Sequence, residues 1–151
     1  MTENNYEIFA ESDHNEKALD MLMREGRIHD VKMILVDRKE FLKLAQIYER
    51  YGYMDDAANY YGVAGQHEKS APMFEKIERF GKAGEAYYKA SNYEKALEMY
   101  RETGKNKARI AQIYEKLGEY AKAAKIWKEL GKPKKYQKCV AKLNSRKLFD
   151  V

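Results

Sequence analysis

Apolar side chains recur every three or four positions along most of the chain, the spacing that places them on one face of an α-helix. The segments from Phe41 to Tyr51 and from Tyr120 to Leu130 show this pattern, and neither alternates with the period of two that a strand requires. Residues with high strand propensity (Val, Ile and Thr) are scarce, and the 13 tyrosines follow the same helical spacing. The pattern therefore predicts an all-α fold.

Glycine punctuates the chain at a regular interval. Six glycines lie at or within one residue of a multiple of thirteen: Gly26, Gly52, Gly65, Gly104, Gly118 and Gly131. A glycine after an amphipathic run is typical of a helix C-terminus, because glycine adopts the left-handed capping conformation at little cost. Two other turns are expected at residues 37–39 and 91–92, which carry turn-forming side chains. The remaining turn, near Glu78, is predicted to be displaced to Gly81.

These signals predict ten helices of about three turns each. The predicted spans are 14–25, 28–36, 38–51, 54–64, 67–79, 82–90, 93–103, 107–117, 120–130 and 133–144. The residues expected to cap helix N-termini are Asp13 with Glu16, Asp37 with Glu40, Ser91 or Asn92, and Asn106. Pro133 suits the first helical position. Pro72 is expected in the first turn of a helix that starts near Ser70, or at a kink.

Three segments of the chain align with one another without a gap: Ala45–Gly65, Gly84–Gly104 and Ala111–Gly131. Each contains a small residue, a tyrosine, a turn residue, an alanine and an aromatic residue at matching positions. Small residues that face aromatic rings let two antiparallel helices approach closely. Each copy is therefore predicted to be a helical hairpin, within one repeat domain over residues 13–147 that is flanked by tails at 1–12 and 148–151.

The pattern from Ala111 to Trp127 resembles the tetratricopeptide repeat, and the resemblance covers about residues 38 to 131. The hairpins run 26 or 27 residues, whereas the family's period is about 34. The shorter period is closer to the tetratricopeptide-like solenoids of coat and transport-particle proteins. The resemblance implies a right-handed α-α superhelix of short antiparallel helices, whose curved inner face binds a peptide or protein segment without catalysis.

The residues themselves offer little for catalysis or metal binding. His14, His29 and His67 lie apart from one another, and no pair has the spacing of metal ligands on a helix. Cys139 belongs to an apolar stripe and is predicted to be a buried structural thiol. The Gly81-x-x-Gly84 pattern lacks the context of a nucleotide-binding loop and is interpreted as a turn. We therefore expect no enzyme activity, no cofactor, no metal and no small-molecule substrate.

Two tyrosine pairs are candidates for a groove. Adjacent residues on a helix point about 100° apart, so only one ring of Tyr60-Tyr61 and one of Tyr87-Tyr88 can take the core position. Tyr60 and Tyr88 are the candidate groove aromatics. The alternative is that both rings of each pair are partly buried between neighbouring helices.

The net charge of +5 hides a strong asymmetry. Residues 1–65 carry 8 basic and 13 acidic side chains, whereas residues 66–151 carry 21 and 11. Two basic stripes are predicted on the last two helices: Lys122, Lys125, Lys128 and Lys132, and then Lys135, Lys138, Lys142 and Arg146. They suit a phosphate backbone or an acidic protein surface, although the solvated face of a terminal repeat would also carry charge.

The favoured function is a scaffold that binds a protein partner on its helical-repeat surface. The alternative is an RNA- or ribosome-associated factor that uses the basic stripes, and a third possibility is a piece of a longer transport or coat solenoid. A single cysteine, the polar N-terminal segment and the lack of an apolar run of about 20 residues predict a cytoplasmic protein without membrane insertion.

Overall fold

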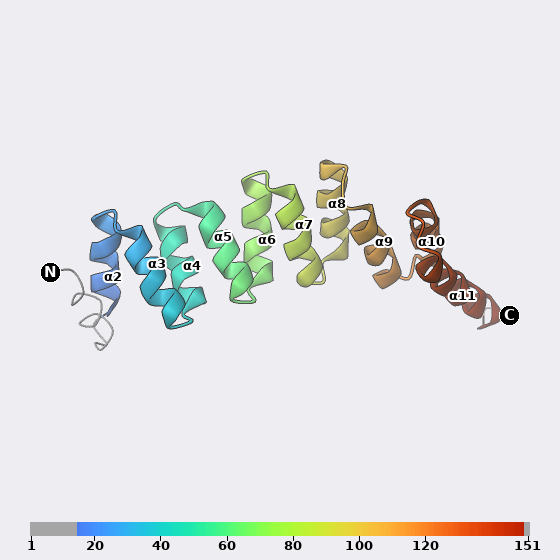
Figure 1. Cartoon of the computed structure of the whole chain (residues 1–151), viewed down its shortest axis with the longest axis horizontal. Coiled ribbons are helices and arrows are strands. Elements are labelled where there is room, and N and C mark those ends of the chain that lie inside the picture. The colour runs from blue at the N-terminus through green and yellow to red at the C-terminus, as the bar shows by residue number, and fades with distance from the viewer. Residues whose placement is uncertain (1–14, 150–151) are drawn as a thin grey trace. The chain divides into compact units, whose positions relative to one another are not determined.

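The computed structural model describes residues 15–149 of the chain and the side chains of 16–145. This part contains ten α-helices and no strand, as Figure 1 shows, so the all-α prediction is confirmed. The helices are α2 (Asn15–Arg24), α3 (Ile28–Asp37), α4 (Phe41–Arg50), α5 (Met54–Val63), α6 (His67–Lys76), α7 (Phe80–Lys89), α8 (Tyr93–Thr103), α9 (Lys107–Lys116), α10 (Tyr120–Glu129) and α11 (Pro133–Phe149).

The chain divides into two compact units, the first ending at Ser70 and the second beginning at Ala71. In the first unit α2 packs against α3, α3 against α4, and α4 against α5. In the second unit α7, α8, α9, α10 and α11 do the same (Figure 1). The helices from α2 to α10 have 10 or 11 residues and are too short to be stable alone, so the packing of consecutive helices supplies their stability. The single repeat domain over 13–147 stays a prediction.

Every turn between consecutive helices contains a residue with positive φ, and these residues follow a thirteen-residue interval with one exception. They are Gly26, Lys39, Gly52, Gly65, Glu78, Ser91, Gly104, Gly118 and Gly131. The turns predicted at 37–39 and 91–92 are confirmed, but the displacement to Gly81 is wrong. Gly81 is the second residue of α7, and Glu78 takes the left-handed conformation with φ of 59°. The regular helix length thus determines the turn even where no glycine is present.

A single residue ends one helix and begins the next in most of these turns. The Tyr53 N–H donates to the Tyr48 carbonyl at 2.8 Å, and the Tyr53 carbonyl accepts from the Ala57 N–H at 2.8 Å. The first bond caps α4 as in a Schellman motif, and the second opens α5. Because the two bonds share one residue, the path between helices is short and closely defined.

The turn after α8 is the exception to the interval. Gly104 and Asn106 both have positive φ, and one additional residue lengthens the spacing to the next turn from thirteen to fourteen. Asn106 occupies the N-cap position of α9, but its side chain makes no capping hydrogen bond there. The additional residue explains why two of the aligned segments start 27 rather than 26 residues apart.

The other predicted helix ends had mixed outcomes. The Asn92 side chain caps α8 by accepting from the Lys95 N–H at 3.2 Å, which confirms that prediction. The Asp37 cap is wrong, because α3 continues through Asp37 until Lys39 ends it, and Glu40 is the N-cap residue of α4 without a side-chain bond. The Asp13 cap and His14 lie outside the described residues.

The two prolines also differ in outcome. Pro133 is the first residue of α11, as predicted. Pro72 is the sixth residue of α6 rather than part of its first turn, because the turns at Gly65 and Glu78 fix where that helix begins and ends. Pro72 is exposed, so water can reach the helix backbone where the proline lacks an N–H. α11 continues to Phe149, beyond the predicted end at 144.

The core repeats with the same interval as the turns. The eighth residue of each helix from α3 to α10 is a large buried side chain: Leu35, Tyr48, Tyr61, Phe74, Tyr87, Tyr100, Tyr114 and Trp127. From α4 to α10 the fourth position, the fifth position or both hold a buried alanine or glycine, which leaves space for these large side chains. At Gly84 the space is fully used, since a Cβ atom there would lie 3.0 Å from Cε1 of Tyr100. The prediction of small residues packed against aromatics is confirmed at this position.

The Lys39→Gly substitution is expected to raise the free energy of unfolding by about 1 kcal/mol, because lysine at a φ of 58° is strained where glycine is not. Gln46→Gly, at an exposed position inside α4, is the matched control and is expected to lower it by about 1 kcal/mol. Urea denaturation followed by circular dichroism measures both. A decrease for Lys39→Gly would contradict the assigned turn.

Candidate functional site

Four of the buried aromatic side chains at the eighth helix position are hydrogen-bonded to a residue of the preceding helix. The Tyr61 hydroxyl donates to the Glu49 carboxylate at 2.5 Å, and the Trp127 indole N–H donates to Glu115 at 2.5 Å. Equivalent bonds, from the ninth residue of one helix to the eighth of the next, join Glu75 to Tyr87 and Arg101 to Tyr114. The sequence analysis missed these bonds, although three of the four pairs share a separation of twelve residues. Glu115 is thereby engaged inside the second unit.

Two of the predicted basic-stripe residues make a repeated structural contact. The Lys122 ammonium lies 5.3 Å from the Tyr114 ring centroid, and that of Lys135 lies 4.2 Å from the Trp127 ring centroid. Lys69 and Lys82, also third in their helices, cover rings of the preceding helices in the same way. Lys122 also forms an ion pair with Glu119. Cation–π packing therefore accounts for part of the basic stripes.

The Lys135→Ala substitution tests this structural role. We expect it to lower the free energy of unfolding by about 0.5–1 kcal/mol, because the ring of Trp127 loses its cation. Lys132→Ala, at an exposed lysine nearby, should change stability by less than about 0.5 kcal/mol. Equal effects in urea denaturation would argue against a specific Lys135 contact.

The remaining basic-stripe residues are available to a partner. Within the described part of the chain, five of the predicted lysines are exposed and make no ion pair: Lys125, Lys128, Lys132, Lys138 and Lys142. Arg146 belongs to α11, but its side chain lies outside the described residues. In the two stripes, Lys122 and Lys135 contact neighbouring rings, whereas the five lysines named above make no ion pair among the described residues.

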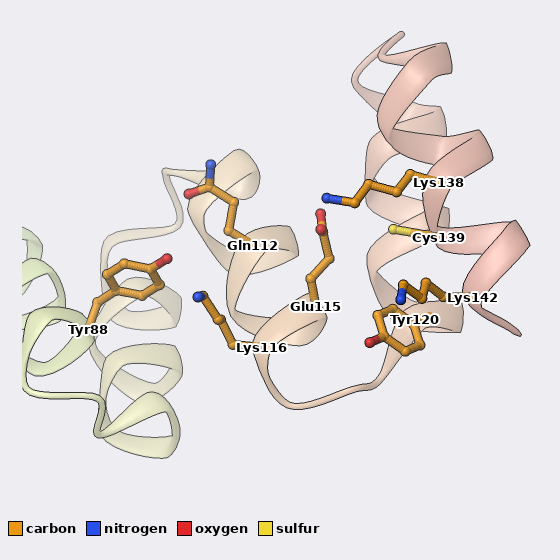
Figure 2. A pocket seen from close by; sticks show the side chains of 8 residues that line it. All are labelled: Tyr88, Gln112, Glu115, Lys116, Tyr120, Lys138, Cys139 and Lys142. Carbon is orange, nitrogen blue, oxygen red and sulfur yellow. The ribbon is translucent and has the colours of Figure 1, made fainter. Parts of the chain in front are cut away.

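A pocket of about 330 Å³ in the second unit brings two of the uncommitted lysines together with a predicted groove aromatic (Figure 2). It runs across the alternate helices α7, α9 and α11. Its lining residues are Tyr88, Gln112, Glu115, Lys116, Tyr120, Lys138, Cys139 and Lys142. We refer to this pocket as the basic groove. It joins candidate residues that the sequence analysis had treated as separate features.

Aromatic and charged side chains define the walls of the basic groove. The Arg109 guanidinium lies 4.8 Å from the Tyr88 ring centroid and pairs with Glu85 at 2.9 Å, so the Tyr88 ring is held in place. Figure 2 shows the Lys116 amino group directed toward Tyr88, and that of Lys138 directed toward the Glu115 side chain. The Glu115 carboxylate already accepts a hydrogen bond from the Trp127 indole. The lining of the groove therefore contains three lysines and one carboxylate, which is hydrogen-bonded within the unit.

Cys139 forms part of the groove wall and is only 1% exposed, so the predicted burial of this thiol is confirmed. Burial, with a smaller contribution from the nearby Glu115 carboxylate, raises the pKa of the Cys139 thiol. The thiol therefore holds its proton at neutral pH. A protonated thiol is a poor nucleophile and a poor metal ligand.

Tyr60, the other predicted groove aromatic, lies in the first unit. Its ring stacks on Phe41 with centroids 6.4 Å apart and contacts the Tyr48 ring at 5.7 Å. These contacts make it part of an aromatic cluster between α4 and α5, which agrees with the alternative that both rings of that tyrosine pair are partly buried. The structure thus brings Tyr88, but not Tyr60, to the basic groove.

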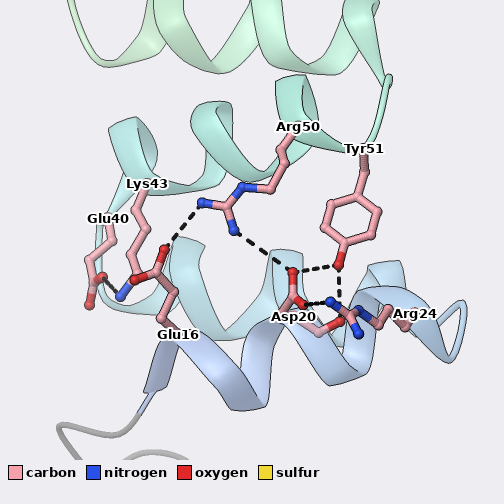
Figure 3. Close-up of polar contacts among 7 residues, drawn as sticks. All are labelled: Glu16, Asp20, Arg24, Glu40, Lys43, Arg50 and Tyr51. Atoms are coloured by element: carbon pink, nitrogen blue, oxygen red, sulfur yellow. Dashed lines mark hydrogen bonds and ion pairs between the residues drawn. The ribbon is translucent and has the colours of Figure 1, made fainter.

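Charged residues of the first unit are largely paired with one another. The Tyr51 hydroxyl donates to the Asp20 carboxylate at 2.5 Å, and Arg24 pairs with the same carboxylate at 2.8 Å (Figure 3). Arg50 reaches both Glu16, at 3.1 Å, and Asp20, at 3.8 Å. The Tyr51 hydrogen bond and the two arginines hold the pKa of Asp20 below its ordinary value. This cluster joins α2 to α4 and acts as a structural staple.

Comparison of the chain with protein-family models, curated proteins and solved structures gave no significant match. In residues 15–149 no helix is long and apolar enough to cross a membrane. Among the described side chains no group of three or more His, Cys, Asp or Glu residues is arranged to hold a metal ion. The basic groove is the described feature that brings several predicted site residues together, namely Tyr88, Lys138 and Lys142.

Proposed function

We propose that this chain is a non-enzymatic helical-repeat adaptor that binds a segment of a partner protein in its basic groove. The proposal includes a tetratricopeptide-like right-handed superhelix, for which the thirteen-residue repeat and the packing of consecutive helices are the support. Repeat folds of this kind offer extended faces between alternate helices. Such faces suit binding of an extended segment.

The observation that carries the proposal is the groove across α7, α9 and α11. Lys116, Lys138 and Lys142 line it without ion pairs to other described residues. Lysines that outnumber the carboxylates around a concavity attract acidic groups and steer their approach, and the Tyr88 ring offers an apolar face beside them. The groove therefore favours an acidic segment that also carries apolar side chains.

The same groups favour binding over catalysis. Glu115 is bonded to Trp127, which restricts its use as a general base. The raised pKa of Cys139 keeps that thiol protonated. What remains in the groove are lysines, amide and phenol groups, which bind and orient a ligand.

A second candidate function is attachment to RNA or to a ribonucleoprotein such as the ribosome. Its support is the exposed row Lys125, Lys128 and Lys132 in α10 and the following turn, where no ion pair is formed among described residues. Lysines in a row neutralise phosphates without reading bases. Binding of this kind would weaken steeply with salt.

Affinity capture from cell extract, with and without nuclease, separates the two functions. The groove variant is Lys138→Glu with Lys142→Glu, and the stripe variant is Lys125→Glu with Lys128→Glu. The matched control is Lys76→Glu with Lys89→Glu, two exposed lysines of the same unit outside the groove. Circular dichroism verifies that all three remain folded.

If the adaptor function is correct, a protein partner is still captured after nuclease treatment. The control and the stripe variant bind this partner, whereas the groove variant does not. We expect the loss to be about tenfold or more in bound partner. Capture that disappears with nuclease and with the stripe variant, while the groove variant binds normally, would overturn the adaptor function in favour of RNA attachment.

A further inference from the structure

We propose that the basic groove binds the acidic segment 1–13 of a second copy of this chain, so that copies associate head to tail. This inference rests on the proposed function of the groove as a site for an acidic segment, and it names one occupant. Two observations support it: the composition of the segment, and the excess of lysines over carboxylates in the groove.

The segment 1–13 matches the chemistry of the groove. It carries four acidic side chains, Glu3, Glu7, Glu11 and Asp13, and neither lysine nor arginine. Tyr6, Ile8 and Phe9 lie between the acids. The groove offers the complementary set, three lysines in addition to the half-buried ring of Tyr88. Carboxylates can therefore pair with lysines while an apolar side chain packs on the ring.

The charges of the two units favour association between copies. The sequence of the first unit, residues 1–70, carries 9 basic and 14 acidic side chains, whereas residues 71–151 carry 20 and 10. Four of the 14 acidic side chains lie in segment 1–13, so this segment carries most of the negative excess. The segment of one copy and the basic unit of another therefore attract each other over distances of about 10 Å at moderate ionic strength. This attraction brings segment 1–13 of one copy toward the groove of the next.

The arginines of α2 and α4 already have carboxylate partners of their own. Arg50 and Arg24, the cations of the staple in Figure 3, are already paired with Asp20 and Glu16. The three groove lysines, by contrast, have no ion pair among the described residues. The basic groove therefore combines these lysines with an aromatic ring, the two features that an acidic segment with apolar side chains can contact.

Sedimentation velocity over a range of protein concentrations at low salt tests the proposal. The segment variant, with Glu3→Gln, Glu7→Gln, Glu11→Gln and Asp13→Asn, has an intact groove. The groove variant, with Lys138→Glu and Lys142→Glu, has an intact segment. We expect the wild-type sedimentation coefficient to rise with concentration, and each variant alone to associate about tenfold more weakly. The Lys76→Glu and Lys89→Glu control should behave as wild type.

Mixing the two variants is the decisive step, since the segment of one can enter the groove of the other. We expect the mixture to form a one-to-one complex, and a labelled peptide of residues 1–13 to bind the segment variant but not the groove variant in fluorescence anisotropy. A peptide whose four acids are replaced by amides should bind about tenfold or more weakly.

Wild-type protein that stays monomeric throughout, or a mixture that does not associate, would overturn the inference. Peptide binding without any association of the wild type would show that the segment occupies its own groove, which also overturns association between copies. The proposed adaptor function is tested separately. A protein partner that is captured after nuclease treatment, requires Lys138 and Lys142, and is not displaced by the peptide would support the adaptor function. The same result would overturn only the association between copies.

Discussion

Replacing Trp127 with alanine is expected to lower the free energy of unfolding by about 3–5 kcal/mol. The indole is 1% exposed, donates to Glu115 at 2.5 Å, and is covered by the Lys135 ammonium at 4.2 Å. The substitution leaves a cavity, deprives the carboxylate of its donor and removes the surface on which Lys135 packs. Because Trp127 is the one tryptophan of the chain, urea denaturation is followed by circular dichroism rather than by fluorescence.

The Trp127→Phe substitution separates the hydrogen bond from the ring. It retains most of the apolar volume and removes the N–H, so we expect a smaller loss of about 1–2 kcal/mol. The Lys135→Ala effect should shrink in the alanine background, because the two residues act through one contact. A loss below about 1 kcal/mol for Trp127→Ala would contradict its place in the core.

The thirteen-residue punctuation was predictable because glycine marks a left-handed turn in the sequence itself. Glu78 shows where that reasoning fails. The sequence predicts a turn at the nearest glycine, yet Gly81 lies inside α7 and Glu78 adopts the positive φ. The packing of the buried Phe74 and Tyr87, thirteen residues apart, fixes the helix length, and a backbone cost of about 1 kcal/mol at Glu78 is smaller than the cost of moving either ring.

The candidate site was predictable in part. Helical periodicity was sufficient to place the lysines of α10 and α11 on exposed faces. It gave no sign that Lys122 and Lys135 cover the rings of Tyr114 and Trp127, since that contact depends on the preceding helix. Nor did it associate Tyr88 with Lys138, which are fifty residues apart in the chain. Only the arrangement of the helices in space brings them to the lining of one groove.

The free energy of unfolding is expected to fall between pH 10 and pH 12. Burial, the largest cause, raises the pKa of both Tyr48 and Tyr61 to about 12, with further contributions from Asp56 at Tyr48 and from the Glu49 hydrogen bond at Tyr61. A tyrosine in the unfolded chain has a pKa of about 10. The fold therefore favours the neutral phenol, and its ionisation opposes folding.

The direction of the pH dependence follows from proton binding. Below pH 10 the phenols are protonated in both states, and their contribution to stability is complete. Above pH 10 the unfolded chain releases these protons first, so the folded state binds more of them and stability falls as pH rises. The contribution of these two phenols stops falling once pH passes their folded pKa of about 12, whereas Tyr87 and Tyr100, whose pKa is raised further by burial, continue to lower stability. A pKa difference of one corresponds to about 1.4 kcal/mol. Because the pKa of each tyrosine rises from 10.0 to about 12, the two residues together lower the free energy of unfolding by about 5 kcal/mol once both are ionised.

Urea denaturation at a series of pH values between 10 and 12 measures this loss. The Tyr61→Phe variant removes one phenol: it is less stable at neutral pH, because Glu49 loses its donor. Its stability should fall less steeply above pH 10 than that of the wild type, because Tyr48, Tyr87 and Tyr100 still ionise. The ultraviolet absorbance of tyrosinate should rise together with the loss of helix. A wild-type profile that stays flat from pH 10 to pH 12 would mean that the two phenols are accessible to solvent, contrary to their 2% exposure in the core.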